Sequence, residues 1–203
     1  SLSQTTLKMT ATGLPDFYQG SELWDLSLVD PDNRRPVDFA QRARLLQEVQ
    51  RLRIADFGFR TEDTAVDPSS AIRHPQFSDG RIKLFLIWRG LRARRENKKL
   101  FDIGDYVPAS VTGRRAAHVV AFFRSRAATH ALVVAPRFLT SLVRPGASPL
   151  GRPVWEDTAI ELPEGAPSTW QDAITGQTLQ ARAQVLVGDI LAGFPTAILL
   201  GYP

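Results

Sequence analysis

The sequence predicts an α+β fold in which a mainly helical first half is followed by an antiparallel β-sandwich. In the first hundred residues, apolar side chains recur at helical spacings of three and four. Nine of the fourteen glycines fall at or after Gly104, and prolines interleave with them to separate short apolar runs. The 203 residues have room for one domain or two small ones. A complete (β/α)8 barrel, which needs about 250 residues, does not fit.

The first forty residues predict a helix, a strand and a polar loop. The helix covers residues 3–10, and a short buried strand follows over residues 13–18. A long polar loop leaves the strand. Asp38 and Gln41 then predict the capped start of a helix over residues 39–53. This order is one βα unit preceded by the end of a helix, and in such units ligand contacts lie on the loop at the carboxyl end of the strand.

A further helix is predicted over residues 80–96, after a linker at residues 67–70. Between Arg81 and Lys99 there are eight basic residues and one acidic residue. We interpret the basic side chains as the outer face of an amphipathic helix, solvated or packed on acidic neighbours. The alternative is a nucleic-acid-binding helix, but the aromatic platforms or base-reading element of such a site are not seen. We therefore expect no nucleic-acid partner.

Short β-rich runs predict the strands of the sandwich. Trp155 and Trp170 lie among them, and we interpret both as core residues. The alternative is an aromatic platform that binds sugar. The predicted strands cover residues 119–124, 131–135, 158–162, 184–187 and 196–200.

The residue types present exclude several kinds of site. The absence of cysteine excludes disulfides, thiolate zinc sites and cysteine nucleophiles. His74, His118 and His130 lie far apart in sequence, and no metal site is expected from them. No apolar run approaches the roughly 18 to 20 residues of a membrane span, and no signal-peptide pattern opens the chain. We expect a soluble, cytoplasmic protein with no membrane partner.

The loop at residues 30–36 reads Asp-Pro-Asp-Asn-Arg-Arg-Pro. A calcium loop is excluded because Arg35 stands at the sixth position, where such a loop needs glycine. A structural turn is one interpretation, since prolines limit flexibility and Asp and Asn cap themselves. A sugar-binding loop is the other, since carboxylates and guanidinium groups on a stiff loop form paired hydrogen bonds to vicinal hydroxyls.

Five segments carry a recognisable pattern: residues 13–25, 28–38, 79–85, 104–108 and 118–122. Together they resemble the C-terminal part of the maltooligosyl trehalose synthases, a family of the α-amylase superfamily (glycoside hydrolase family 13). The first segment alone, with its Gly-x-Pro-x-x-Tyr-x-Gly-x-Glu pattern, indicates the superfamily. The loop at residues 30–36 with its flanks points to the trehalose-forming branch.

The resemblance implies that the chain is a fragment with three parts. Residues 1–60 would be the last βα unit of a catalytic (β/α)8 barrel. Residues 61–100 would be a linker and a connecting helix, and residues 101–203 a C-terminal antiparallel β-sandwich. The missing N-terminal barrel portion of the same enzyme is the expected partner, and an exposed apolar face is expected within residues 1–60.

The reaction that the resemblance implies is a retaining intramolecular transglycosylation for trehalose biosynthesis. Such enzymes isomerise the reducing-end α-1,4 bond of a maltooligosaccharide to α,α-1,1 with an Asp nucleophile, a Glu acid/base and no cofactor. These carboxylates come from earlier barrel strands. The chain therefore has no expected catalytic residue, and the fragment alone is expected to be inactive.

The resemblance also implies a set of substrate-binding residues. In related enzymes an Asp-Pro-x-x-Arg loop after the last barrel strand contacts glucose near the cleavage point, and this pattern falls on Asp30 and Arg34. For Tyr18, packing at the end of the predicted strand is an equal alternative. Weaker candidates, which would shape the loop, are Asn33, Arg35, Glu22 and Trp24.

Two other functions remain open. The chain could come from a different glucan-active enzyme of the α-amylase superfamily, because the residues that determine the reaction lie upstream. It could also be a non-catalytic carbohydrate-binding or stabilising module in which the β-sandwich carries the function.

Overall fold

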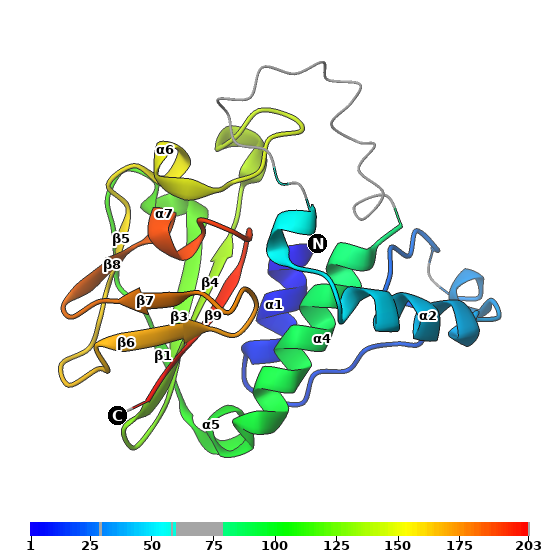
Figure 1. Ribbon diagram of the computed structural model, residues 1–203, viewed down its shortest axis with the longest axis horizontal. Helices are drawn as coiled ribbons and strands as arrows, with labels where there is room; N and C mark the ends of the chain where they lie inside the picture. The colour runs from blue at the N-terminus through cyan, green and yellow to red at the C-terminus, as the bar shows by residue number, and fades with distance from the viewer. Residues whose placement is uncertain (29, 58, 60–78, 203) are drawn as a thin grey trace.

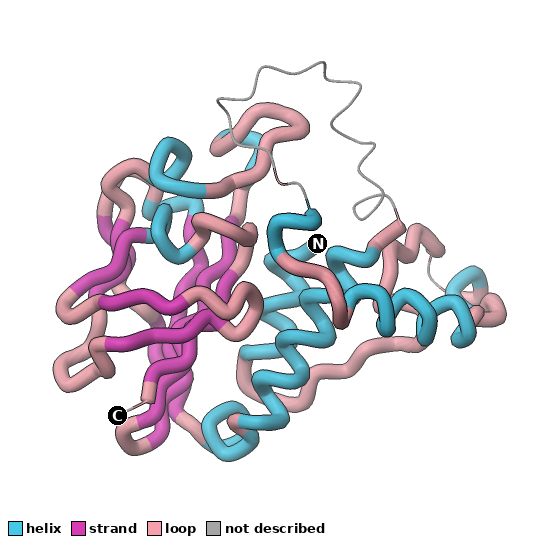
Figure 2. Tube along the Cα trace, viewed as in Figure 1, coloured by secondary structure: helices cyan, strands magenta, loops and turns pink. Residues whose placement is uncertain are grey.

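The computed structural model describes residues 1–28, 30–57, 59 and 79–202 of the chain. Figure 2 shows the longer helices gathered on one side of the molecule and the strands, with a few short helices among them, on the other. The mixed α+β class and the antiparallel sheets are thus confirmed. The predicted linker at residues 67–70 and His74 lie outside the described residues.

Two helices form the centre of the helical side. Figure 1 shows α1 lying along α4, with the strands on one side of this pair and α2 on the other. The predicted helices at residues 3–10 and 80–96 are therefore confirmed. None of the described helices is long and apolar enough to cross a bilayer. The described helical elements before the first strand are α1 (Leu2–Thr10), η1 (Asp32–Arg34), α2 (Phe39–Val49), η2 (Ile54–Phe57), α4 (Arg81–Glu96) and α5 (Lys98–Ile103).

Helix α2 begins as predicted and ends four residues early. The Asp38 carboxylate accepts a hydrogen bond from the Gln41 amide at 2.8 Å, which satisfies one of the free donors of the first turn. At the other end the Arg51 amide donates to the Glu48 carbonyl, three residues back instead of four. The Asp56 carboxylate then accepts from the Arg53 amide at 2.6 Å and caps a separate 3-10 turn, η2. This local capping stops the helix before residue 53.

The predicted strand at residues 13–18 is wrong, because the described chain forms no strand there. An extended segment is stable as a strand when a neighbour pairs with its backbone groups. The described strands instead pair with one another in two sheets. Residues 14–18 run without regular structure, and a turn closes them where the Ser21 amide donates to the Tyr18 carbonyl at 3.0 Å.

In the described part of the chain, the strands form two antiparallel sheets. The larger has the order β1-β3-β4-β9-β6-β7 and the smaller β2-β5-β8. All five predicted strands are confirmed, as β3, β4, β5, β8 and β9. The bounds are β1 (Asp105–Pro108), β2 (Val111–Thr112), β3 (Val119–Arg126), β4 (Thr129–Pro136), β5 (Ala159–Glu161), β6 (Thr169–Asp172), β7 (Thr178–Gln180), β8 (Gln184–Leu186) and β9 (Ala197–Gly201). Among them lie η4 (Ala116–His118), η5 (Leu139–Ser141), α6 (Gly151–Trp155) and α7 (Val187–Ile190).

The central strands of the larger sheet are buried on both faces. Successive strand residues point to opposite faces. On β9, Ile198 and Leu200 join a core shared with α1 and α4, whereas Ala197 and Leu199 join a second core shared with the smaller sheet. This double burial explains why β4 and β9 read as continuous apolar runs.

Both tryptophans of the strand region are core residues, as predicted. Trp155 and Trp170 are 0% and 1% exposed and belong to the core between the sheets. The Trp155 indole donates to the Pro149 carbonyl at 2.8 Å. The alternative of an aromatic sugar platform is wrong because neither ring reaches the surface.

The predicted basic outer face of α4 needs a correction at Arg94, which is buried. Its guanidinium donates to the carbonyls of Met9 at 3.0 Å and Gly13 at 2.7 Å. Several of the other basic residues in this stretch are paired with acidic neighbours, such as Arg92 with Glu96 at 2.7 Å. The expectation that this stretch binds no nucleic acid stays a prediction.

Candidate functional site

The polar loop folds into a short turn. Residues Asp32–Arg34 form the 3-10 helix η1, in which the Arg34 amide donates to the Pro31 carbonyl at 3.0 Å. The Leu28 amide donates to the Asp32 carboxylate at 2.9 Å and ties the start of the loop to the turn. This hydrogen bond, with help from Arg35, holds the pKa of Asp32 below its usual range. The loop is therefore a shaped element with its own internal bonds.

Asp30 and Arg34 face each other across this turn. The guanidinium engages both carboxylate oxygens, with Nη2 to Oδ2 at 2.7 Å and a second bond from Nε to Oδ1. The Asp30 side chain is 56% exposed and the Arg34 side chain is 70% exposed. An exposed pair of this kind adds little to stability. It does present a preformed row of acceptors and donors on the surface, the pattern that binds vicinal hydroxyls.

Arg35 and Asn33 complete the loop in different ways. The Arg35 guanidinium binds the Asp32 carboxylate and keeps 71% of its own side chain exposed. The Asn33 side-chain oxygen is buried and has no hydrogen-bond partner among the described residues. A buried amide oxygen without a donor is costly, so Asn33 carries a local energetic cost in this turn.

Glu22 points to α2. Its carboxylate accepts from Arg42 Nε at 3.1 Å, and the same guanidinium donates to the Gly20 carbonyl at 2.9 Å and the Asp38 carbonyl at 3.1 Å. Arg42 thus joins the segment after Tyr18 to the start of the helix that follows the loop. This arrangement gives Glu22 a loop-shaping contact.

Trp24 lies against the start of α4. Lys83 Nζ is 5.9 Å from the centre of its ring and donates to the Leu23 carbonyl at 3.1 Å. Burial lowers the pKa of the Lys83 ammonium group, with the attraction of Asp25 opposing this. Gly80 has a φ of +81°, and a Cβ on it would lie 2.7 Å from the Trp24 amide nitrogen. Glycine is therefore required where α4 begins beside Trp24.

The structure distributes six of the seven predicted residues over three groups of contacts. Asp30, Asn33, Arg34 and Arg35 share the loop; Glu22 contacts α2; and Trp24, which is 36% exposed, lies beside α4. The Tyr18 ring is 48% exposed and is not buried as strand-end packing.

Arg42 and Lys83 are the positioning residues that the sequence alone did not single out. Arg42 comes one residue after the cap partner Gln41, but its partner Glu22 is twenty positions away. Lys83 lies sixty positions from Leu23. Local spacing could not reveal either contact. In the described part of the chain, no three or more His, Asp or Glu side chains gather as metal ligands would.

The fold resembles one part of an α-amylase. The whole chain superposes on a segment of an Anoxybacillus α-amylase with a TM-score of 0.54 at 14% identity, covering 32% of that chain. No family model matches the sequence.

The chain is similar to maltooligosyl trehalose synthases. It is 34% identical over 200 residues to a Mycobacterium tuberculosis protein described as such an enzyme, which is 98% of this chain and 20% of the relative. The structure of the maltooligosyltrehalose synthase from Arthrobacter ramosus superposes with a TM-score of 0.68 at 34% identity, covering 98% of this chain and 22% of that one. The chain thus spans about one fifth of the length of the relatives it matches.

Proposed function

We propose that the chain is the C-terminal part of a maltooligosyl trehalose synthase. Residues 1–60 would close its catalytic (β/α)8 barrel, residues 61–100 would connect the two domains, and residues 101–203 would form the C-terminal β-sandwich. The observation that carries the proposal is the 34% identity over nearly the whole chain to enzymes of this name. The intact protein would isomerise the reducing-end α-1,4 bond of a maltooligosaccharide to α,α-1,1.

The role of this chain in that reaction would be to hold glucose. The retaining mechanism needs an Asp nucleophile and a Glu acid/base, which the resemblance assigns to earlier barrel strands. Asp30 and Arg34 would bind the released glucose so that its anomeric hydroxyl, rather than water, attacks the intermediate. Their exposed, preformed pair supports this role because both groups keep hydrogen-bonding capacity toward solvent.

The rest of the same enzyme would cover the apolar surface of the helical side. A groove of about 790 Å³ lies between α2 and α4, lined by Leu46, Leu84, Ile87, Trp88 and Leu91 with two arginines beside them. Leu26 is 93% exposed and Leu28 is 77% exposed. Apolar surfaces of this extent mark an interaction site. Missing barrel elements would account for them.

The function is tested with a chimaera. The matched segment of the Arthrobacter ramosus enzyme is replaced by this chain, and products formed from maltopentaose are separated by chromatography. We expect a trehalosyl product from the chimaera and none from the 203-residue chain alone. Hydrolysis products without the trehalosyl isomer would show a different reaction of the α-amylase superfamily. Turnover by the homogeneous 203-residue chain would refute the assignment of the catalytic carboxylates to the rest of the enzyme.

The loop is tested in the same chimaera. Asp30→Ala and Arg34→Ala each remove a charged hydrogen-bonding group, worth about 1.5–3 kcal/mol. We expect kcat/KM to fall about ten- to hundred-fold, or hydrolysis to rise relative to isomerisation. Arg44→Ala, an exposed arginine on α2, is the matched control and should leave both unchanged. If kcat/KM and the ratio of hydrolysis to isomerisation are the same in all three variants, the loop is a structural turn without a role in binding glucose.

A further inference from the structure

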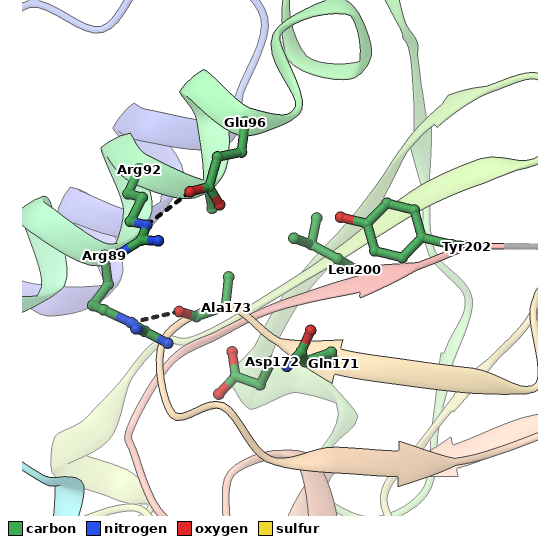
Figure 3. A pocket seen from close by; sticks show the side chains of 9 residues that line it. Arg89, Arg92, Glu96, Gln171, Asp172, Ala173, Leu200 and Tyr202 are labelled. Atoms are coloured by element: carbon green, nitrogen blue, oxygen red, sulfur yellow. Dashed lines mark hydrogen bonds and ion pairs between the residues drawn. The ribbon is translucent and has the colours of Figure 1, made fainter.

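A polar pocket lies far along α4, between this helix and the larger sheet. Its volume is about 240 Å³. Figure 3 shows Arg89, Arg92 and Glu96 on the helix side, opposite residues of β6 and of the chain that follows β9. None of its lining residues belongs to the loop at residues 30–36. The polar residues that line it are Arg89, Arg92, Glu96, Gln171, Asp172 and Tyr202.

The floor of the pocket is fixed by Asp172. This fully buried carboxylate accepts hydrogen bonds from the amides of Ile174 at 3.1 Å, Thr175 at 3.1 Å and Ile198 at 3.2 Å. The Thr175 hydroxyl adds a bond at 2.6 Å. These bonds hold the turn after β6, and Arg89 Nε donates to the Ala173 carbonyl within that turn at 2.8 Å. The pocket is therefore preorganised, which lowers the entropic cost of binding.

Both arginines of the pocket have an acidic neighbour. Arg92 Nε binds Glu96 at 2.7 Å, and Asp172 attracts the Arg89 guanidinium. Burial lowers the pKa of Arg89 and raises the pKa of Asp172. The two guanidinium groups thus do not form a cluster of unpaired cations, the arrangement that would favour an anion over a neutral molecule.

The groups left for a ligand are both donors and acceptors. Among the described residues, the terminal nitrogens of Arg89 and Arg92 and the side-chain amide of Gln171 carry no hydrogen bond. One Glu96 oxygen is engaged by Arg92, and the Tyr202 hydroxyl donates to Asn97 at 3.0 Å and can still accept. Ala173 and Leu200 add an apolar surface between them. Hydroxyl groups match this mixture because each hydroxyl both donates and accepts.

We propose that this pocket binds a neutral polyhydroxylated ligand, a single glucosyl unit of an α-glucan. The volume lies below the about 300–1,000 Å³ typical of drug-sized ligands, so one sugar ring is the size that suits it. Its hydroxyls bond to the arginines, Gln171 and Glu96, while its C–H face lies on Leu200. This site goes beyond the proposed function, which requires glucose binding at the residue 30–36 loop alone.

The test is a titration of the 203-residue chain with glucose, maltose and maltotriose, followed by NMR. Gln171→Ala and Arg92→Ala are the test variants, because neither side chain joins the hydrogen bonds of Asp172. Arg95→Ala, an exposed arginine on the same helix outside the pocket lining, is the matched control. We expect saturable shifts at Gln171 and Tyr202, an at least ten-fold higher Kd in both test variants, and an unchanged Kd in the control.

Three results would overturn the proposal. No saturable shift with any of the sugars would show that the pocket binds no saccharide. Binding that Asp30→Ala abolishes and Gln171→Ala leaves intact would place the sugar on the loop. Tighter binding of inorganic phosphate than of maltose would show an anion site. Each outcome is independent of the chimaera assay, so this proposal can fail while the proposed function stands.

Discussion

Asp172 shows how a single buried carboxylate organises the sheet. It accepts four hydrogen bonds, three of them from backbone amides that belong to the turn after β6 and to β9. Desolvation raises the pKa of its carboxyl group above the ordinary 3.8, and the four hydrogen bonds only partly oppose this. The same residue therefore fixes local geometry and carries an electrostatic cost when ionised.

This cost predicts a pH dependence of stability. A raised pKa in the folded state means that the folded chain holds a proton where the unfolded chain has lost it. The stabilising contribution of Asp172 to the free energy of unfolding is complete below about pH 4. It declines as the pH rises through the pKa of Asp172 in the folded state. We expect the free energy of unfolding of the natural chain, relative to Asp172→Asn, to fall between pH 4 and neutrality in urea titrations.

Asp16→Asn is the control for this measurement, since Asp16 is exposed and the change removes the same charge. The difference in the free energy of unfolding between Asp16→Asn and the natural chain should stay constant over the same pH range. A difference for Asp172→Asn that is constant, or that grows with pH, would contradict the desolvation argument.

At the scale of elements, two arginines anchor the end of α1. Arg94 on α4 donates to the carbonyls of Met9 and Gly13, and Arg124 on β3 donates to the carbonyls of Thr10 at 3.1 Å and Gly104 at 2.8 Å. The last carbonyls of a helix have no partner within it. These guanidinium groups supply the missing donors and fix where the chain leaves α1 toward the candidate site.

Removing one anchor should loosen this junction. Arg94→Leu keeps the apolar packing but leaves the buried Met9 carbonyl and the part-buried Gly13 carbonyl without this donor, at a cost of about 2–5 kcal/mol in the free energy of unfolding. Arg95→Leu on the same turn is exposed and should change stability by less than about 0.5 kcal/mol. Chemical denaturation of both variants measures the difference. Equal stability would mean that water replaces the guanidinium without loss.

The elements that sequence could predict are those whose signal is local. The cap at Asp38 and the apolar runs of β3, β4 and β9 depend on neighbouring residues. Strand β1 carries four exposed residues and is defined by pairing with β3. Strand β6 pairs with β9, about thirty positions away. Contacts of that range, like those of Arg42 and Lys83 at the candidate site, leave no local pattern to read.

At the scale of the whole molecule, the most exposed large apolar side chains of the described residues lie on the helical side. A core lies on each face of the central strands, one packed against α1 and α4 and the other against the smaller sheet. The segment around the candidate site exposes several large apolar side chains. These are Leu14, Tyr18, Trp24, Leu26, Leu28 and Phe39, and Leu14 and Leu26 are the most exposed at 87% and 93%.

This surface should make the chain self-associate. Burying a leucine side chain is worth about 1.5–3 kcal/mol, so a contact through several of them is stable at micromolar concentration. We expect sedimentation velocity to show concentration-dependent association that Leu26→Glu with Leu28→Glu weakens at least ten-fold. Ile103→Glu, at a position 64% exposed on α5, is the control. A monomer at all concentrations would contradict the prediction.

The place of β9 in the sheet has a consequence for synthesis on the ribosome. Strand β9 lies between β4 and β6 and supplies residues to both cores. Until residues 197–201 emerge, β1-β3-β4 and β6-β7 are two separate groups of strands, and each core lacks part of its filling. A premature stop a few codons before Ala197 would therefore damage the fold as thoroughly as one far upstream. The two groups of strands join into one sheet only when β9 is present.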